Sequence, residues 1–230
     1  MKNVKRAAFT SIFLLLAAPA SCAEKPTSES FSVAGNIIKF STPEGFCVPE
    51  GAYIDFASKM RANDVYHNVY VTLYKCADMK SGISPTESFS LVTLKNDEIL
   101  LSGNRASYLQ EYAKFIADKN QKKASEALSA PLIRQAEKDA SEQNGATTTI
   151  HKNNSSQQFD QYGYYNVISN TVNVGDKAAS VVTGGSITVV NHVIVNIRHT
   201  VVFAEFDENT ESKFDFLKYQ TKNLDEMNPQ

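Results

Sequence analysis

The sequence predicts an α+β fold, a single domain in which helices cover both faces of a mainly antiparallel sheet, giving an α/β/α sandwich. Three observations predict it. Strand-like segments alternate with turn residues up to residue 95, a helical block follows at 105–143, and segments dense in Val, Ile and Thr fill the chain from residue 147. Strands that follow one another through short turns favour antiparallel pairing. A content of 42% hydrophobic and 21% charged residues is that of a globular protein.

The N-terminal 23 residues are predicted to be a signal peptide. Lys2, Lys5 and Arg6 precede an apolar segment at 7–18, and small residues follow it. About twelve apolar residues are too few to cross a hydrocarbon core of ~30 Å as a helix. A retained membrane anchor and a buried first helix are the alternatives.

The leader has two candidate cleavage sites. Cleavage after Ala23 removes Cys22, whereas cleavage after Ala20 leaves Cys22 near the new N-terminus. Cys22 is also a candidate for the lipidated first residue of a lipoprotein, although Pro19 stands where such signals usually carry Leu. The domain is therefore expected in the periplasm of a Gram-negative bacterium or outside the cell. The expected organisation is signal peptide 1–23, flexible lead-in 24–30 and a single domain at 31–230.

Charge and hydropathy limit the partners of the mature chain. Loss of the three basic leader residues takes the formal net charge from −2 to about −5, and no stripe of Lys or Arg compensates for it. Nucleic acid is therefore not an expected partner, because phosphate neutralisation dominates such binding. No other segment approaches 18 consecutive apolar residues, so no transmembrane segment is expected after the leader.

Two cysteines, Cys47 and Cys76, lie in the mature chain and are predicted to form a disulfide. An even number of cysteines in an oxidising compartment favours a bond. Closing a loop of about 30 residues stabilises a fold by roughly 3–4 kcal/mol in the chain-entropy model. Two buried free thiols are the alternative. A metal site is supported less well than either of these interpretations, because no second pair of Cys or His stands at ligand spacing.

The first half of the domain is expected to alternate short strands with one helix. Residues 31–40 form a hairpin whose turn is placed at Gly35-Asn36, and residues 52–62 form a short helix. The strand 66–76 places Val69, Val71 and Leu73 on one side and its tyrosines on the other. A loop at 80–85 and a strand at 88–95 complete this half.

The second half opens with helices and ends with long strands. An apolar stripe predicts helix from residue 105, a charged run at 119–123 is interpreted as a solvated face, and Pro131 restarts the helix, which ends at Asn144-Gly145. The segments 153–156 and 157–161 are interpreted as a polar loop. The expected strands are 147–150, 162–174, 178–190 and 193–206, with a turn at 191–192, and a helix at 209–225 closes the domain.

The entry Ile38-x-Phe40-x-x-Pro43-x-Gly45-Phe46, with this order of elements, resembles the PsbP/Mog1-like α/β sandwich family. The resemblance implies a scaffold used mainly by non-enzymatic binding and assembly factors. The Pro-x-Gly-Phe-Cys element with a later cysteine on a strand also resembles exported bacterial proteins. Neither resemblance assigns a function to any residue.

No residue is predicted to be catalytic, to bind a cofactor or to ligate a metal. No Gly-x-Ser-x-Gly motif is present, and Gly184-Gly185 inside a strand indicates a bulge or bend, with close approach of a ligand as the alternative. His199 is expected on the core side of its strand with a hydrogen bond, opposite to the side of His192. His67 and His151 have no carboxylate partner that the sequence makes evident. Asp207 and Glu208 are expected at a helix N-terminus.

The leading hypothesis is a non-enzymatic periplasmic binding or adaptor domain whose partner is a protein or a small ligand. Two alternatives stay open. One is a secreted enzyme, of hydrolase type, whose site is assembled from distant segments. The other is a secreted interaction or inhibitor protein. A concave pocket with convergent polar groups would distinguish a ligand site from an apolar protein-docking patch.

Overall fold

The computed structural model describes residues 28–95, 103–118, 130–131, 133–138, 140–142, 145–203 and 211–229. The predicted leader, the charged run at 119–123 and the acidic pair at 207–208 lie outside these residues. The strands are β1 (Ser28–Val33), β2 (Asn36–Ser41), β3 (Phe46–Cys47), β4 (His67–Lys75), β5 (Glu87–Leu94), β6 (Thr148–Phe159), β7 (Tyr164–Val174), β8 (Lys177–Val190) and β9 (Val193–Phe203). The helices are α1 (Ala52–Asn63), α2 (Cys76–Ser81), α3 (Arg105–Ala117) and α5 (Glu211–Glu226).

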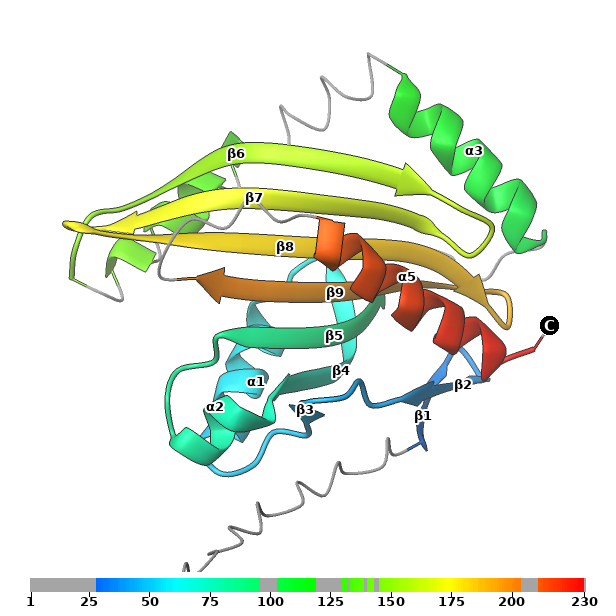
Figure 1. Ribbon diagram of the computed structural model, residues 1–230, viewed down its shortest axis with the longest axis horizontal. Coiled ribbons are helices and arrows are strands. Elements are labelled where there is room, and N and C mark those ends of the chain that lie inside the picture. The colour runs from blue at the N-terminus through cyan, green and yellow to red at the C-terminus, as the bar shows by residue number, and fades with distance from the viewer. Residues whose placement is uncertain are drawn as a thin grey trace, which may run out of the picture.

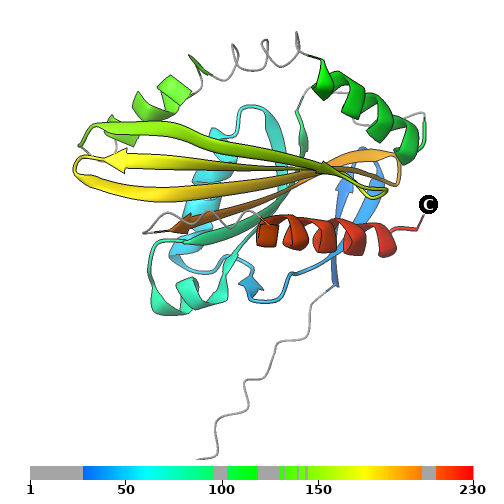
Figure 2. The same ribbon diagram turned by 45° about the horizontal axis from the view of Figure 1, so that its top comes forward.

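A seven-stranded antiparallel sheet in the order β3-β4-β5-β9-β8-β7-β6 forms the centre of the fold (Figure 1). Helix α5 crosses one face of the sheet, and α3 lies beyond the other (Figure 2). The predicted α+β class is confirmed. No helix in the described ranges has both the length and the apolar character needed to span a membrane.

The two faces of the sheet differ in chemistry. The closed face carries the hydrophobic core, in which Leu73, Leu91 and Ile197 pack against Phe214 and Leu217 of α5. Strand β9 shows the alternation that the sequence predicts, because every second residue from Val193 to Val201 is buried. The opposite face, here called the open face, is defined by the central row Thr72, Ser90, Arg198, Gly185, Asn166 and Gln157.

The hairpin β1–β2 forms a separate two-stranded sheet against the closed face. Its turn lies at Ala34 and Gly35, both with positive φ, and not at Gly35-Asn36 as predicted. The pair Val33–Asn36 closes the hairpin, so Asn36 is already in β2. A two-residue hairpin turn of type I′ has positive φ at both central residues, and Ala34 adopts this conformation beside the glycine. Asn228 fixes the hairpin, since its side chain bonds both the N–H and the C=O of Lys39 at 2.8 and 2.7 Å.

Strand β4 contains a bulge that overturns the predicted alternation of Val69, Val71 and Leu73. Its pairing with β5 shifts between Val69 and Val71, so Tyr70 is the extra residue. The bulge moves Val69 to the open face, whereas Val71 and Leu73 stay in the core. Tyr70 then stacks on Phe31 of the hairpin, with ring centroids 5.0 Å apart.

Two further elements differ from the prediction. Residues Cys76–Ser81 form the short helix α2, ended by Gly82 in the left-handed conformation, where the sequence analysis expected strand and then loop. Residues 153–159, predicted as part of a polar loop, belong to the edge strand β6. Strand β6 has a bulge between Lys152 and Asn154. A polar edge strand lacks the apolar alternation on which the strand predictions depended.

The described parts of 130–142 are helical and support β6. The Thr148 N–H donates to Ser141 Oγ at 2.8 Å, and the Ile150 N–H donates to Glu137 Oε1 at 2.7 Å. Side chains of this helix therefore satisfy backbone donors at the outer edge of the sheet.

At the other edge, Cys47 and Cys76 lie at disulfide distance, with Cα atoms 5.1 Å apart. Cys47 pairs with Tyr74 across β3 and β4, and the Cys76 N–H donates to Gly45 O at 2.9 Å. The pair therefore attaches the short strand β3 and the loop around it to the end of β4.

The predicted bulge at Gly184-Gly185 is wrong, because β8 pairs without a shift of register on both sides. The two glycines face opposite sides of the sheet. A Cβ atom on Gly184 would stand 2.8 Å from Leu217 Cδ1, so this glycine lets α5 approach the closed face. A Cβ atom on Gly185 would meet nothing closer than Ile197 O at 3.8 Å. Gly185 therefore leaves a hollow in the open face.

Candidate binding site on the open face of the sheet

Rows of polar side chains run across the open face from strand to strand. Because cross-strand partners in an antiparallel sheet share a face, the registers place one residue from each of six strands in line. The central row is Gln157, Asn166, Gly185, Arg198, Ser90 and Thr72. The row beside it is Ser155, Ile168, Thr183, Thr200, Ser88 and Tyr74. The middle of a sheet is usually its most apolar part, so this polar composition is unusual.

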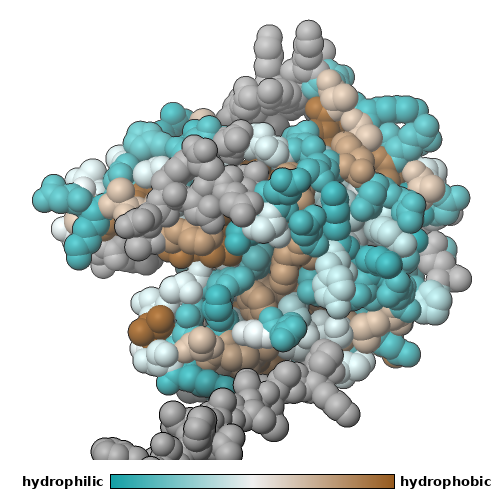
Figure 3. All heavy atoms as spheres, viewed as in Figure 1, coloured by the Kyte–Doolittle hydropathy of each residue, from teal (hydrophilic) through white to brown (hydrophobic). Residues whose placement is uncertain are grey.

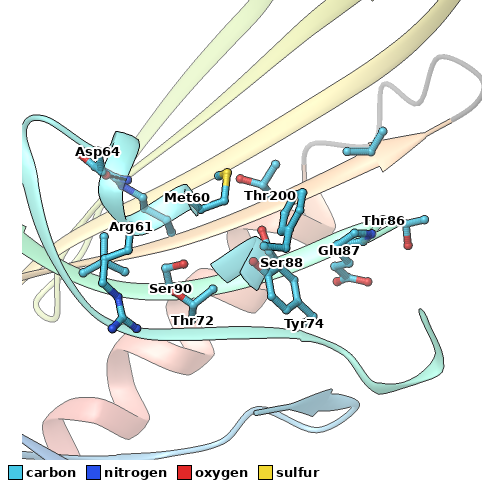
Figure 4. Close-up of a pocket in the computed structure, with 15 residues that line it drawn as sticks. Met60, Arg61, Asp64, Thr72, Tyr74, Thr86, Glu87, Ser88, Ser90 and Thr200 are labelled. Carbon is cyan, nitrogen blue, oxygen red and sulfur yellow. Dashed lines mark hydrogen bonds and ion pairs between the residues drawn. The ribbon is translucent and has the colours of Figure 1, made fainter. Parts of the chain in front are cut away.

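The first of two cavities on this face, here called the α1 cavity, lies between α1 and the sheet. It has a volume of about 200 Å³, and Phe56 and Met60 of α1 form its apolar wall. Its floor carries hydroxyl groups from three neighbouring strands: Thr72, Ser88, Ser90 and Thr200. Asp64 and Glu87 stand at opposite ends of this cavity (Figure 4).

Tyr74 lines the α1 cavity and is only 2% exposed. Its ring contacts Tyr53 and Phe56, with centroid distances of 5.6 and 5.8 Å. Burial raises the pKa of the Tyr74 phenol to about 12, so the group stays protonated. The Tyr74 hydroxyl has no hydrogen-bond partner among the described residues. It is therefore a donor and acceptor beside a cavity, with nothing bonded to it.

The second cavity, here called the α3 cavity, is larger, at about 790 Å³. This volume lies in the range of pockets that hold organic ligands, roughly 300–1,000 Å³. Aromatic residues of α3 form one wall, and strands β7, β8 and β9 form the other. Asn166 and Asn196 line the strand wall, and the side-chain oxygen of each is buried without a partner in the described part of the chain.

The aromatic wall is a series of nearly parallel rings along α3. Tyr108 and Tyr112 have centroids 5.9 Å apart at 21°, and Tyr112 and Phe115 have centroids 6.3 Å apart at 25°. Tyr112 also contacts Tyr164 of β7 edge to face at 5.3 Å. Figure 3 shows hydrophobic side chains gathered along α3. Phe115 remains 55% exposed at the end of the series.

An ion pair separates the two cavities. Arg198 lines both of them, and its Nη1 donates to Asp64 Oδ2 at 2.6 Å. Asp64 Oδ1 accepts from His67 Nδ1 at 2.9 Å and from the backbone N–H groups of Tyr66 and His67. Burial acts to raise the pKa of Asp64, but the hydrogen bonds from His67 and Arg198 and their charges outweigh it, so the pKa is lowered. The carboxylate thus neutralises the arginine at the centre of the face.

The histidines are placed partly as predicted. His199 is on the core side of β9, 2% exposed, with its ring 4.2 Å from that of Phe216. Its Nε2 donates to Glu87 Oε1 at 2.7 Å, and Glu87 also accepts from Lys75 at 2.8 Å. The hydrogen bond from His199, together with Lys75, outweighs burial and lowers the pKa of Glu87 to about 2. The expectation that His67 lacks a carboxylate partner is wrong, because Asp64 stands three residues before it.

The site contains binding groups, and the sequence analysis predicted none of them as such, although it gave close approach of a ligand as the alternative at Gly184-Gly185, and Gly185 lines the α3 cavity. His151 and His192 are exposed and contribute to neither cavity. Within the described ranges, no three residues of the types His, Cys, Asp and Glu gather closely enough to hold a metal ion. Hydroxyls, amides, aromatic rings and a neutralised ion pair can hold an uncharged organic molecule. The signal in the sequence was the run of polar residues at alternate positions, 88 and 90 in β5 and 196, 198 and 200 in β9.

No protein-family model and no curated protein sequence matches the chain. Among solved structures it is similar to the solution structure of cyanobacterial PsbP (CyanoP) from Synechocystis sp. PCC 6803, at 12% sequence identity and a TM-score of 0.40. The match covers 89% of this chain and 96% of that one. The weak PsbP-like resemblance that the order of elements predicted is therefore present in the comparison with solved structures. It transfers no functional residue.

Proposed function

We propose that the chain is an exported, non-enzymatic binding protein that seats an organic ligand on the open face, between α1 and α3. One observation carries the proposal. Three buried polar atoms, Tyr74 Oη, Asn166 Oδ1 and Asn196 Oδ1, belong to residues that line the two cavities, and none of them has a partner in the described part of the chain. A buried polar group without a partner costs roughly 1–3 kcal/mol. A ligand that bonds these atoms recovers this free energy on binding.

Ligand binding can be tested by thermal unfolding of residues 24–230 against a library of small polar and amphipathic molecules. A ligand at 100 times its Kd adds about 2.7 kcal/mol to the free energy of unfolding. For a domain of this size, such a gain raises Tm by roughly 5–10 °C. The matched variant is Gly185→Leu, whose side chain fills the hollow of the open face without a backbone clash. It should fold normally and lose the shift. A shift that persists in this variant would place the ligand elsewhere.

The periplasmic location is part of the proposal. The sequence supports it with a leader of signal-peptide layout, and a cysteine pair at disulfide distance is compatible with an oxidising compartment. N-terminal sequencing of the exported protein should find a first residue between Ser21 and Glu24. Retention of Met1 would contradict export by cleavage. A diacylglycerol mass on Cys22 would establish a lipoprotein instead.

A hydrolytic enzyme is the second candidate, and one observation favours it. His67 lines the α3 cavity and bonds the Asp64 carboxylate at 2.9 Å, and the hydroxyl residue Ser155 lines the same cavity. A histidine held by a carboxylate is part of many hydrolytic sites. Turnover of fluorogenic esters and amides by the purified protein, abolished by His67→Ala, would decide for this candidate and against a pure binding protein.

A further inference from the structure

We infer that the α3 cavity binds a neutral glycan, with sugar rings against the aromatic residues of α3 and sugar hydroxyls on the amides of β7 and β9. The inference rests on the proposed function and deepens it by naming the class of ligand. Three features of the cavity lead to it: the ring series, the unpartnered amide oxygens and the neutralised charge.

The ring series offers an apolar surface of the right kind. The rings of Tyr108, Tyr112 and Phe115 are nearly parallel and offset, with centroids about 6 Å apart. Offset rings leave part of each ring face uncovered, and Phe115 is more than half exposed. A sugar ring has one face made of C–H groups, which packs against an aromatic face. Successive rings along a helix therefore suit successive units of an unbranched chain.

The opposite wall selects hydrogen-bonding groups. Asn166 Oδ1 and Asn196 Oδ1 are buried acceptors, so the ligand must bring donors to them. Ionised phosphate and carboxylate groups only accept hydrogen bonds, so they cannot supply these donors. Sugar hydroxyls both donate and accept, and they match an amide, which offers both functions in one plane. Gln157 of β6 is the cross-strand neighbour of Asn166 of β7 and adds a further side-chain amide to this wall.

Charge on the cavity walls also favours a neutral ligand. Arg198 is the central cation, and Asp64 already neutralises it at 2.6 Å. The Asp64 carboxylate is in turn occupied by His67 and two backbone N–H groups. Lys152 lines the cavity as an exposed residue. Among the described residues that line the cavity, no buried charge is left unpaired. A strongly anionic or cationic ligand would therefore find no buried partner of opposite charge.

The test measures binding of defined oligosaccharides to residues 24–230 by isothermal titration calorimetry. The probes are unbranched hexasaccharides of β-1,4-linked glucose, α-1,4-linked glucose and β-1,4-linked N-acetylglucosamine, with a sulfated hexasaccharide and an uncharged polar hexapeptide as competitors of other chemistry. At least one neutral hexasaccharide should bind. Tyr112→Ala, Phe115→Ala and Asn196→Ala should each weaken its affinity at least tenfold.

Matched controls lie outside the cavity. Tyr219→Ala and Asn223→Ala change residues of α5, on the opposite face, and should leave the affinity unchanged. Because Phe115 is largely exposed, its variant tests the ring series even if Tyr112→Ala unfolds.

Each other outcome overturns the inference in a different way. If the glycans fail to bind while another compound raises Tm in a manner that Gly185→Leu abolishes, the proposed function stands and the glycan assignment is wrong. Tighter binding of the sulfated sugar or the peptide also rejects a neutral glycan. Glycan binding that the three variants leave unchanged rejects the α3 cavity as its site. If no compound of either screen binds, the proposed function fails with the inference.

Discussion

Arg198 and Asp64 form an ion pair, with 2.6 Å between Nη1 and Oδ2, that links β9 to the loop after α1. The two residues are 134 positions apart in the chain. Their side chains are 34% and 14% exposed, so water screens the pair only partly. The pair separates the α1 cavity from the α3 cavity and at the same time fixes the loop that leads into β4, whose first residue is His67.

Removal of the Asp64 carboxylate should destabilise this loop. Asp64→Ala loses bonds to Arg198, His67 and two backbone N–H groups and should lower the free energy of unfolding by roughly 2 kcal/mol. Asp64→Asn keeps an oxygen for the backbone donors and should cost about half as much. Urea denaturation measures both. Asp55→Ala, an exposed acidic residue of α1, is the control and should change little. Equal losses in the two Asp64 variants would contradict the role given to the backbone bonds.

The pair Glu87–His199 should make stability depend on pH in acid. The pKa of Glu87 is about 2 in the folded protein, which is below the value of about 4.3 expected in the unfolded chain. A lowered pKa stabilises the fold above the unfolded value, and this contribution is lost as the pH falls from about 4.3 to 2. It amounts to about 3 kcal/mol.

Glu87→Gln provides the measurement. The difference in free energy of unfolding between wild type and this variant should be full above pH 5, should be mostly lost by pH 2 and should vanish below it. Glu50→Gln, an exposed carboxylate outside the sheet, is the control. A difference that stays constant from pH 5 to pH 2 would show that the Glu87 carboxylate does not titrate as described.

The cysteine pair should be a structural disulfide. Cys76→Ser should lower the free energy of unfolding by about 3 kcal/mol and Tm by several degrees, because the open chain gains entropy when it unfolds. Cys47→Ser should have the same effect. A reducing agent should lower the stability of the wild type to that of the variants and should not lower the stability of either variant further. Non-reducing peptide mapping should recover the 47–76 cross-link. Free labelling of both thiols in the native oxidised protein would reject the bond.

The adjacent glycines of β8 should respond in opposite ways to alanine. Gly184→Ala forces its Cβ against Leu217 and should destabilise the fold by roughly 1–3 kcal/mol, the usual cost of overpacking. Gly185→Ala meets only ordinary contacts and should be neutral or slightly stabilising. Thermal unfolding of the two variants makes the comparison. Equal losses would indicate that α5 is less closely packed on β8 than described.

The elements that the sequence predicted well are those whose pattern is local. The alternation of β9 and the apolar stripe of α5 both follow directly from residue spacing. The bulge at Tyr70 was not predictable in this way, because it depends on how β4 pairs with β5. Strand β6 was predicted only at 147–150, and its continuation was missed because these residues are polar on an edge, where burial no longer selects apolar side chains.

The candidate site was beyond the reach of sequence patterns for a different reason. Its parts come from six strands and two helices, and their alignment depends on register. Only the Asp64-x-x-His67 spacing is local, and it was not interpreted as a pair. The partner of Arg198 is not local, since Asp64 lies 134 positions away in the sequence. The polar residues at alternate positions 196, 198 and 200 of the central strand β9 are the pattern from which the open face could have been inferred.

The supported edge of β6 has a consequence for how the molecules behave in concentrated solution. A bare edge strand of twelve residues is a template to which a strand of another molecule can add. Here the side chains of Ser141 and Glu137 already occupy two of its amide donors, and the bulge between Lys152 and Asn154 interrupts the ladder. A strand of another molecule therefore finds no flat, continuous template at this edge, which disfavours the addition of strands along β6.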